Sequence, residues 1–349
     1  MPNKIRWGVV GSGGIARRRT IPEGLVPAAN GQLLGVYDSN LQANTDVAQA
    51  FGVTAFESLE ALLRSEVDAI YIATPVSMHH EHVTHCVKAG KHVLCEKPLA
   101  RTVQEGQELV VLAQACKVQL GVALMMRFQS QHQEALKIVQ SGKLGRAVYG
   151  RAQLSCWYPP IENAWRQDPR QGGGGSLVDM GVHCIDLLEM FFGRVSSVSC
   201  HIGRVVHSYA SEDSAVAALV FENGAMGTVD TFFCIPDDSS QNVLELYGSE
   251  GSILAKGTIG QGSQGEMVLY PRAPADGYNA QQTRGAARGI PLNPAPINTY
   301  QAEIEEFSQA ILDGRESKLD AVVGLRSQRI LEACYESAKT SKNVSINHI

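Results

Sequence analysis

Residues 5–16 read Ile5-Arg6-Trp7-Gly8-Val9-Val10-Gly11-Ser12-Gly13-Gly14-Ile15-Ala16, and this stretch decides the fold. The run Ile5–Val10 is mostly apolar, as in a buried strand, and a Gly-x-Gly-x-x-Ala motif follows it directly. Gly11 permits a tight turn, Gly13 lets the backbone approach a pyrophosphate, and Ala16 lets the next helix pack close to the strand. The stretch therefore predicts a dinucleotide site at a helix N-terminus, with Ser12, Gly14 and Ile15 completing its loop.

The same alternation of short apolar runs and helical patterns continues to residue 123. Repeated strand–helix–strand units predict a parallel α/β sheet with helices on both faces. The expected strands are Ile5–Val10, Gln32–Tyr37, Ala69–Ala73, Val93–Cys95 and Gln119–Val122, and the expected helices are Asn40–Phe51, Met78–Ala89 and Val103–Cys116.

After Ala123 the pattern changes to α+β. Asn223-Gly224 lies between two strand patterns and is typical of a two-residue hairpin, which implies antiparallel pairing. Because 349 residues exceed what one hydrophobic core normally serves, we expect two domains, 1–123 and 124–349. The expected elements of the second are helices at 130–141, 177–192, 299–312 and 320–340 and strands at 147–155, 195–206, 214–222, 225–233, 242–246, 251–254 and 267–270. The segment 271–297 is expected to be a long loop.

The composition excludes several classes of partner. Thirty basic and 35 acidic residues give a net charge of −5, which argues against nucleic acid. No apolar run approaches the roughly 20 residues that a membrane span requires. The eight cysteines form no CxxC motif, so we expect reduced thiols in the cytoplasm.

Asp38 ends the second expected strand, 27 positions after Gly11. A carboxylate there can accept hydrogen bonds from both adenosine ribose hydroxyls and would repel a 2′-phosphate, so the sequence favours NAD over NADP. The alternative is that Asp38 only caps the following helix. The extra spacing is expected to lie in a loop, Pro22–Gly31. The basic run Arg17–Arg19 suits either the phosphates or a solvated helix face.

Thr74-Pro75 ends the fourth expected strand, at the carboxyl edge where ligands bind in open α/β sheets. Histidines follow closely, and one of them, His79, is expected beside the cofactor. His82 and His85 have a spacing that two metal ligands can use, but no cysteine or carboxylate cluster accompanies them, so no metal site is expected.

Two further motifs carry candidate chemistry. Lys97, between Glu96 and Pro98, ends the fifth expected strand and can hydrogen-bond a substrate oxygen, although an ordinary solvated lysine is the plainer alternative. Asp179-Met180-Gly181-Val182-His183-Cys184-Ile185-Asp186 opens a helix after four glycines. On an α-helix Asp179 would lie one turn from His183 and could orient and charge that imidazole as a general base. The alternative is a surface contact on a helix.

Taken together, the glycine motif, Glu96-Lys97-Pro98 and Asp179-x-Gly181-x-His183 resemble the glucose–fructose oxidoreductase/inositol dehydrogenase (Gfo/Idh/MocA) family. The resemblance runs almost end to end and includes Tyr247–Gly251. It implies an N-terminal Rossmann domain with a doubly wound parallel sheet and a C-terminal α+β domain. In the latter, a large, mainly antiparallel, open-faced sheet often joins subunits into homodimers or homotetramers.

The resemblance also implies a function: hydride transfer between a nicotinamide cofactor and a carbinol carbon of a sugar, polyol or sugar derivative. It carries Lys97, Asp179 and His183 over as catalytic residues. Trp165-Arg166 matches a loop that approaches cofactor or substrate, and Arg127 matches a position that often faces the active site. The run Met125–Phe128 departs from inositol dehydrogenases, which disfavours inositol. Two alternatives stay open, an NAD-dependent glycosidase that uses transient oxidation and a non-catalytic dinucleotide or sugar sensor.

Overall fold

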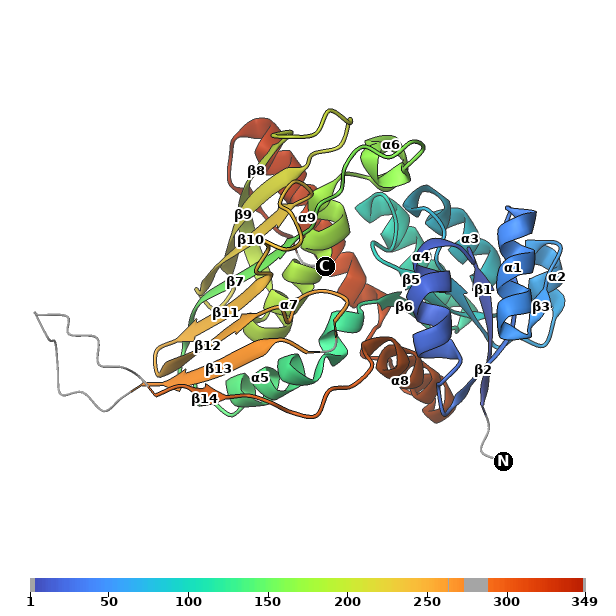
Figure 1. The fold of residues 1–349 in the computed structure, drawn as a ribbon, viewed down its shortest axis with the longest axis horizontal. Helices are drawn as coiled ribbons and strands as arrows, with labels where there is room; N and C mark the ends of the chain where they lie inside the picture. The colour runs from blue at the N-terminus through green and yellow to red at the C-terminus, as the bar shows by residue number, and fades with distance from the viewer. Residues whose placement is uncertain (1–3, 263, 273–287, 348–349) are drawn as a thin grey trace, which may run out of the picture.

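Two β-sheets organise the chain in the computed structural model (Figure 1), which describes residues 4–262, 264–272 and 288–347. The first sheet has six parallel strands in the order β3-β2-β1-β4-β5-β6. This order reverses direction beside β1, which is where such sheets bind ligands at their carboxyl edge. The strands are β1 (Ile5–Val10), β2 (Gly31–Tyr37), β3 (Thr54–Ala55), β4 (Ala69–Ile72), β5 (His92–Glu96) and β6 (Leu120–Ala123).

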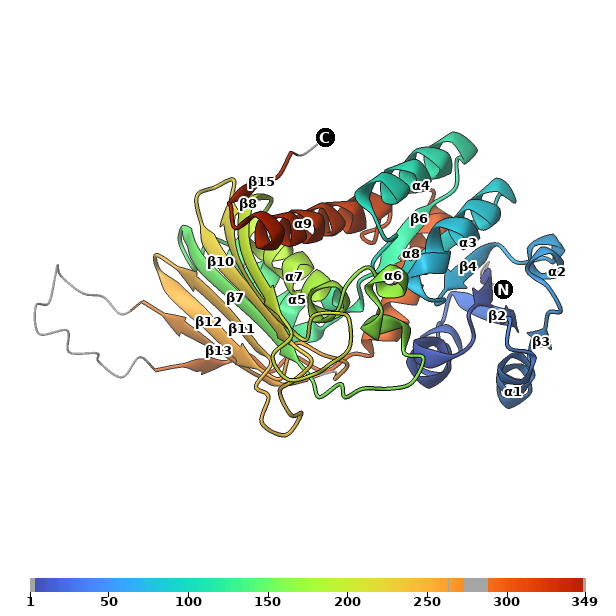
Figure 2. The ribbon, with the colours of Figure 1, turned by 90° about the horizontal axis from the view of Figure 1, so that it is seen from above.

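Helices cover both faces of this sheet, as right-handed crossovers require. Figure 2 shows α3 and α4 on one face and α1 on the other. The helix after β1 is a π-helix, η1, and it includes Pro22. The bounds are η1 (Ala16–Leu25), α1 (Leu41–Phe51), α2 (Leu59–Arg64), α3 (Val76–Lys88) and α4 (Val103–Cys116).

The second sheet has nine strands in the order β14-β13-β12-β11-β7-β10-β9-β8-β15. All of its neighbours pair antiparallel except β7 and β10, which are parallel. The strands are β7 (Ala147–Ser155), β8 (Val195–Gly203), β9 (Ser214–Phe221), β10 (Met226–Phe232), β11 (Val243–Gly248), β12 (Gly251–Lys256), β13 (Glu266–Pro271), β14 (Ile290–Pro291) and β15 (Val344–Ser345).

One face of this sheet is covered by helices and the other is open (Figure 2). Along β9, Ala217 and Leu219 are buried while Val216 and Val220 between them are exposed, as a half-covered sheet requires. The covering helices are α5 (Ser130–Gln140), α7 (Val182–Phe192) and α9 (Ala321–Thr340). Short helical turns precede them at η2 (Met125–Phe128), η3 (Trp165–Gln167), α6 (Pro169–Gly172) and the π-helix η4 (Leu177–Gly181).

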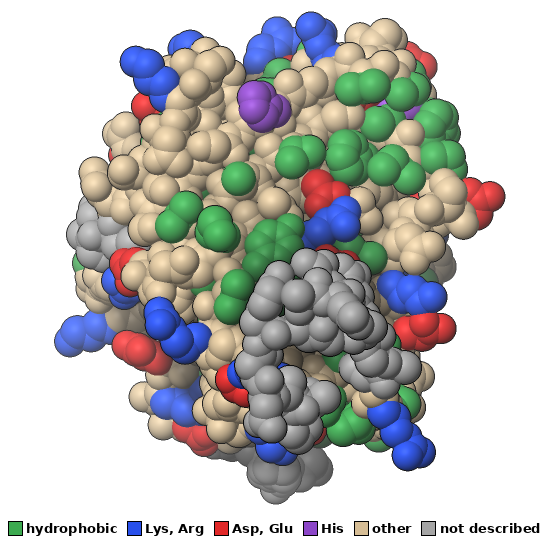
Figure 3. Space-filling view, turned by 90° about the vertical axis from the view of Figure 1, so that its left-hand side faces the viewer, with side chains coloured by type: hydrophobic (Ala, Val, Ile, Leu, Met, Phe, Trp, Pro, Cys, Tyr) green, Lys and Arg blue, Asp and Glu red, His purple; other side chains and the backbone are tan. Residues whose placement is uncertain are grey.

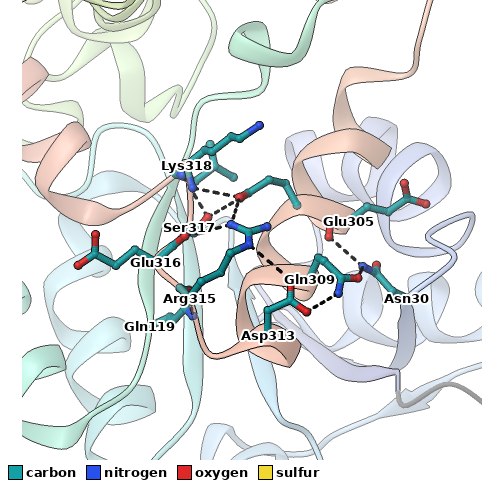
Figure 4. Close-up of polar contacts among 11 residues, drawn as sticks. Asn30, Gln119, Glu305, Gln309, Asp313, Arg315, Glu316, Ser317 and Lys318 are labelled. Atoms are coloured by element: carbon teal, nitrogen blue, oxygen red, sulfur yellow. Dashed lines mark hydrogen bonds and ion pairs between the residues drawn. The ribbon is translucent and has the colours of Figure 1, made fainter.

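Helix α8 (Thr299–Asp313) follows β14 of the second sheet in the chain but packs on the first sheet (Figure 1). The fully buried Trp7 contacts the ring of Phe307 and donates from Nε1 to Ser308 Oγ at 3.0 Å. Two hydrogen bonds tie the helix and its C-terminal end to loops beside the first sheet (Figure 4). Asn30 Nδ2 donates to Glu305 O at 2.9 Å, and Gln119 Nε2 donates to Arg315 O at 2.7 Å.

The structure confirms the predicted fold class of a parallel α/β sheet followed by a large, mainly antiparallel sheet. The Asn223-Gly224 hairpin is confirmed between β9 and β10. Three local expectations were wrong: η1 extends to Leu25 into the expected loop, the helix expected at 177–192 begins as a π-helix, and β3 and α2 were missed. The domain boundary at 123/124 stays a prediction. Most of the expected loop 271–297 lies outside the described residues, and the described part contains the strand β14, so that part of the expectation was wrong. Across the described part of the chain, no helix is long and apolar enough to span a bilayer.

Candidate active site

A cavity of about 460 Å³ lies between the two sheets. Its walls from the first sheet carry Gly14, Thr74 and Lys97, which follow the carboxyl ends of β1, β4 and β5. The opposite walls carry Asp179 on η4 and His183 on α7. Residues from three separate sequence motifs therefore converge at the edge where the sheet topology predicts a ligand.

The glycine loop has the shape that a dinucleotide requires. Gly11 has a φ of +85°, and an added Cβ would meet Ala73 C and Thr74 N at 2.8 Å. By contrast, a Cβ on Gly13 or Gly14 would meet no atom within 4 Å, so open space adjoins the backbone there. This pattern fits a pyrophosphate group resting against the loop, because a side chain would occupy that space. Ser12 is buried, and Ile15 lines the cavity.

Asp38 supports this loop from the end of β2. Its Oδ2 accepts from Ser12 N at 2.9 Å, and its Oδ1 accepts from Asn40 N at 2.9 Å. The side chain that caps α1 is that of Asn40, whose Oδ1 accepts from Ala43 N. The carboxylate of Asp38 therefore anchors the glycine loop, and the helix-cap role considered from the sequence belongs to its neighbour.

His79 braces the turn after β4. It is buried, its Nδ1 lies 2.9 Å from Pro98 O and its Nε2 lies 2.9 Å from Thr74 O. Burial lowers the pKa of His79 to about 4, so the ring is neutral near pH 7 and donates to one of these carbonyls. Pro75 precedes α3 as its N-cap residue. His82 is held by Thr74 Oγ1, and the described residues contain no cluster of three potential metal ligands.

Lys97 and Asp179 form the polar centre of the cavity. Lys97 Nζ donates to Asp179 Oδ1 at 2.8 Å and to Asp179 O at 2.7 Å, and Arg166 Nε donates to the same Oδ1 at 3.0 Å. Burial disfavours the charge on Asp179, but the two cations outweigh burial and hold its pKa below the usual range. Asp179 is therefore an anion at any pH at which the protein would work.

His183 does not meet Asp179 as the sequence predicted. No hydrogen bond joins the two side chains, and among the described residues the buried Nδ1 of His183 has no partner. The reason is local: residues 177–181 form a π-helix, whose bonds span five residues, so a spacing of four no longer stacks side chains. Burial and the nearby charge of Lys97 lower the pKa of His183 to about 3, against the opposing effect of Asp179. The imidazole is neutral, not charged by its neighbour.

Glu96 lies behind Lys97 at the end of β5. Its carboxyl group accepts a short hydrogen bond from Tyr71, which in turn accepts one from Thr20 Oγ1. Burial raises the pKa of Glu96, against the opposing effect of Lys97. This chain connects the cavity to η1 and stiffens the end of the strand that carries Lys97.

Arg127 is not brought to the cavity. Its guanidinium makes a bidentate ion pair with Asp186, with Nε–Oδ2 at 2.8 Å and Nη2–Oδ1 at 2.6 Å. Both side chains are largely buried. This pair joins η2 to α7 and lies outside the cavity lining. The Trp165-Arg166 loop does reach the cavity, where the Arg166 guanidinium stacks on the Trp165 ring at 4.1 Å.

Several cavity residues had no sequence signal. They come from the end of β7, from the loop between β10 and β11 and from the start of α8, and no motif marks them. Knowing that β7 and β10 are neighbours would have placed two of these segments together, but that pairing is not local in sequence. The principal ones are Leu154, Ser155, Cys156, Asp237, Asn242 and Tyr300.

Comparison with known proteins identifies the family to which both halves of the fold belong. Residues 5–124 match the model of an oxidoreductase family with an NAD-binding Rossmann fold, and residues 132–254 match the GFO/IDH/MocA C-terminal domain. A trans-1,2-dihydrobenzene-1,2-diol dehydrogenase of Mus musculus is 31% identical over 251 residues, 71% of this chain and 73% of that protein. A 1,5-anhydro-D-fructose reductase of Ensifer adhaerens is 27% identical over 310 residues, 88% of each chain.

Solved structures show the same fold. An aldose–aldose oxidoreductase from Caulobacter crescentus, complexed with glycerol, superposes with a TM-score of 0.88 at 23% identity, covering 98% of this chain and 100% of that one. A levoglucosan dehydrogenase with NADH and levoglucosan superposes with a TM-score of 0.85 at 22% identity, covering 99% and 100%. From the matched domains and the 31% identical relative we conclude that this chain belongs to the GFO/IDH/MocA oxidoreductase family.

Proposed function

We propose that this oxidoreductase transfers a hydride between NAD and a hydroxyl-bearing carbon of a sugar, polyol or sugar derivative. The observation that carries the proposal is the convergence of Lys97, Asp179 and His183 in a cavity that the glycine loop borders. Relatives named D-xylose 1-dehydrogenase and D-glucoside 3-dehydrogenase, 26% identical to this chain over 347 and 340 residues, support the substrate class.

The residues that would hold the cofactor follow the strand ends. Gly11, Ser12, Gly13, Gly14 and Ile15 would take the pyrophosphate, and Asp38 the adenosine ribose. Thr74, Pro75, His79, Glu96 and Arg166 would border the nicotinamide half. When bound, the nicotinamide supplies the hydride acceptor or donor. The carboxylate of Asp38 accepts hydrogen bonds from Ser12 and Asn40 and makes no ion pair among the described residues, which favours NAD. The relative from Haloferax volcanii, a D-xylose 1-dehydrogenase, is named for NADP.

Lys97 would polarise the reacting oxygen. An ammonium has three N–H donors, and Asp179 takes two of them, which leaves one for a substrate hydroxyl or carbonyl. Asp179 fixes the direction of that third donor and balances its charge. Asp179 therefore orients Lys97 and not His183, which revises the role inferred for Asp179 from the sequence.

His183 would move the proton. Its ring is neutral, so in the oxidation direction it can accept the proton of the hydroxyl group as the carbon loses its hydride and becomes a carbonyl carbon. In the reduction direction the protonated ring returns that proton. Trp165 and the methionines of η2, Met125 and Met126, supply apolar cavity surface that limits access of water to the reacting carbon.

Reduced cofactor absorbs at 340 nm, which provides the test. Polyols, aldoses and nucleotide sugars are incubated with the protein and NAD, then with NADP. We expect NADH formation with at least one sugar or polyol and a higher kcat/KM with NAD than with NADP. Cleavage of a glycoside without net NADH would instead favour the transient-oxidation glycosidase, and binding without any turnover would favour a sensor.

We also propose a homodimer or homotetramer built through the open face of the nine-stranded sheet. Figure 3 shows hydrophobic side chains scattered over this side of the molecule. Val148, Ile202, Val216, Val220 and Met226, from strands of this sheet, are exposed. Light scattering should give two or four times the 37.6 kDa chain mass. The eight cysteines are unpaired, which supports the reducing, cytoplasmic location expected from the sequence.

A further inference from the structure

Each cation that lines the cavity already donates to a protein group, and two of the three share one carboxylate. Lys97 and Arg166 share Asp179, and Glu96 provides a second carboxyl group beside them. Arg18 donates from Nε to Gly14 O at 3.2 Å, on the glycine loop where cofactor phosphate is expected. In the described lining, three carboxyl groups, those of Glu96, Asp179 and Asp237, face three cations, Arg18, Lys97 and Arg166.

The histidines add no positive charge. Burial lowers the pKa of His79 to about 4 and that of His183 to about 3, so both rings are neutral near pH 7. Arg127, the other cation considered from the sequence, is bound to Asp186 outside the lining. Among the described residues of this cavity, a phosphate or carboxylate on the substrate would therefore find Lys97 and Arg166 already sharing Asp179. It would find Arg18 without an ion pair, but beside the loop where the cofactor phosphate is expected.

The wall opposite the cofactor loop carries a carboxylate instead. Asp237 lies in the loop between β10 and β11 and is exposed to solvent. Its Oδ1 accepts from Trp157 N at 3.2 Å, and within the described part of the chain no cation forms an ion pair with it. No described residue donates a hydrogen bond to its Oδ2, so this oxygen can accept from a substrate hydroxyl. The negative charge of the carboxylate repels an anionic substituent.

Asn242 presents a donor on the same wall. Its Oδ1 accepts from Ser155 N at 2.9 Å and from Ser240 Oγ at 2.7 Å. A backbone N–H can only donate, so the atom facing Ser155 N must be the amide oxygen. The amide nitrogen, Nδ2, is then available to donate to a ligand. The φ of Asn242 is +46°, a conformation that asparagine tolerates better than most residues. Next to it, the buried Ser155 lines the cavity with a hydroxyl that has no partner among the described residues.

We propose that Asp237 and Asn242 form a hydroxyl-binding wall that selects an uncharged sugar and discriminates against its phosphate or uronic acid. The proposal rests on the proposed function and refines its substrate class. Neutral hydroxyl groups can donate to Asp237 and accept from Asn242 without a counter-charge. An anionic group would meet one unpaired carboxylate at short range, a repulsion worth roughly tenfold in affinity at the effective dielectric of a protein surface.

The experiment compares matched neutral and acidic sugars. D-glucose and D-galactose are assayed with NAD at 340 nm beside D-glucuronate, D-galacturonate and the two 6-phosphates. We expect kcat/KM for the better neutral sugar to exceed that of its anionic counterparts at least about tenfold. Sodium chloride should lower KM for the uronates and leave KM for the neutral sugars unchanged, because salt screens a repulsion between charges.

Two adjacent aspartates provide a matched pair of variants. Asp237→Asn should raise the uronate-to-neutral ratio of kcat/KM roughly tenfold, whereas Asp238→Asn, in the exposed neighbour that does not line the cavity, should leave it unchanged. Asn242→Asp keeps the acceptor for Ser155 N but loses the donor, and should lower kcat/KM for neutral sugars by roughly two- to tenfold. KM for NAD should not move in any of the three.

A higher kcat/KM for a uronate or a phosphate than for its neutral parent would overturn this inference and leave the proposed function intact. Equal effects of Asp237→Asn and Asp238→Asn would also overturn it. Absence of turnover with every sugar in the wider panel, neutral and anionic, would remove the proposed function together with this inference.

Discussion

Lys97 and Asp179 are 82 positions apart in the chain and are joined twice, because the ammonium donates to Oδ1 at 2.8 Å and to the main-chain oxygen at 2.7 Å. A side chain at the end of β5 is thereby held by both the side chain and the backbone of η4. The reacting centre that we propose is consequently shared between the two halves of the fold, and its geometry depends on how the two sheets are packed.

Lys97 and Asp179 should behave as one unit in mutagenesis. Lys97→Met removes the donor to the reacting oxygen, and Asp179→Asn removes the carboxylate that holds it; each should lower kcat roughly 10²–10³-fold. The double variant should lose little more than either single variant, since both changes disable the same interaction. Steady-state kinetics of the three variants test this, and losses that multiply would mean that the residues act independently.

His183→Ala should lower kcat by roughly 10²–10⁴-fold, the usual contribution of a positioned proton-transfer group. Its effect on NAD binding should be small, because no described contact links His183 to the glycine loop. Turnover is followed at 340 nm, and NAD affinity by calorimetry. Near-normal turnover would show that another group takes the proton.

Asp38→Asn should shift cofactor preference towards NADP. The amide can still accept from Ser12 N and so retain part of the loop contact, while the charge that repels a 2′-phosphate is gone. We expect the NAD-to-NADP ratio of kcat/KM to fall by about tenfold or more. Asp46→Asn, on the exposed side of α1, serves as the control. An equal loss with both cofactors would remove Asp38 from the ribose site.

Stability should decrease on the acid side. His79 and His132 are buried with pKa values lowered to about 4, and His183 to about 3, chiefly by burial. The unfolded chain then binds more protons than the folded one below pH 6.5, so the free energy of unfolding falls as pH drops from about 6.5 towards 4. By pH 4 the loss should reach up to about 3 kcal/mol per histidine. Urea unfolding at several pH values measures this slope, and His132→Gln should flatten it.

Arg127→Met should destabilise the fold without changing the KM for substrate. The change leaves the buried carboxylate of Asp186 without its partner, which typically costs about 3–5 kcal/mol. The double variant Arg127→Met/Asp186→Leu removes both charges and should recover most of that loss. Denaturant unfolding and KM are measured together. A raised KM in a variant of normal stability would mean that Arg127 contacts the substrate after all.

Local patterns predicted much of the first sheet from the sequence. The bounds of β1 and α4 agree with expectation to the residue, because a short apolar run and an amphipathic repeat depend only on neighbouring positions. The two π-helices could not be anticipated. Apolar spacing does not distinguish a π-turn from an α-turn, and this is why the contact expected between Asp179 and His183 was wrong.

The motif residues on strand ends were placed correctly at one edge, since parallel strands bring their carboxyl ends together. Asp237 and Asn242 could not be predicted, because their positions depend on strand pairing that is not local in the sequence. They lie in a loop without a motif, and they reach the cavity because β10 pairs with β7 and β11 pairs with β7 on its other side. Strand order in a mixed sheet is a property of the whole chain rather than of any window in it.

Helix α8 has a consequence for how the polypeptide is made. Trp7 packs against helix α8, which begins at Thr299. The part of the first sheet that α8 covers therefore stays exposed until residues 299–313 have left the ribosome. A nascent chain would expose this apolar face throughout synthesis of the second sheet, which invites chaperone binding or aggregation. The sheet that is translated first is therefore among the last parts to be completed.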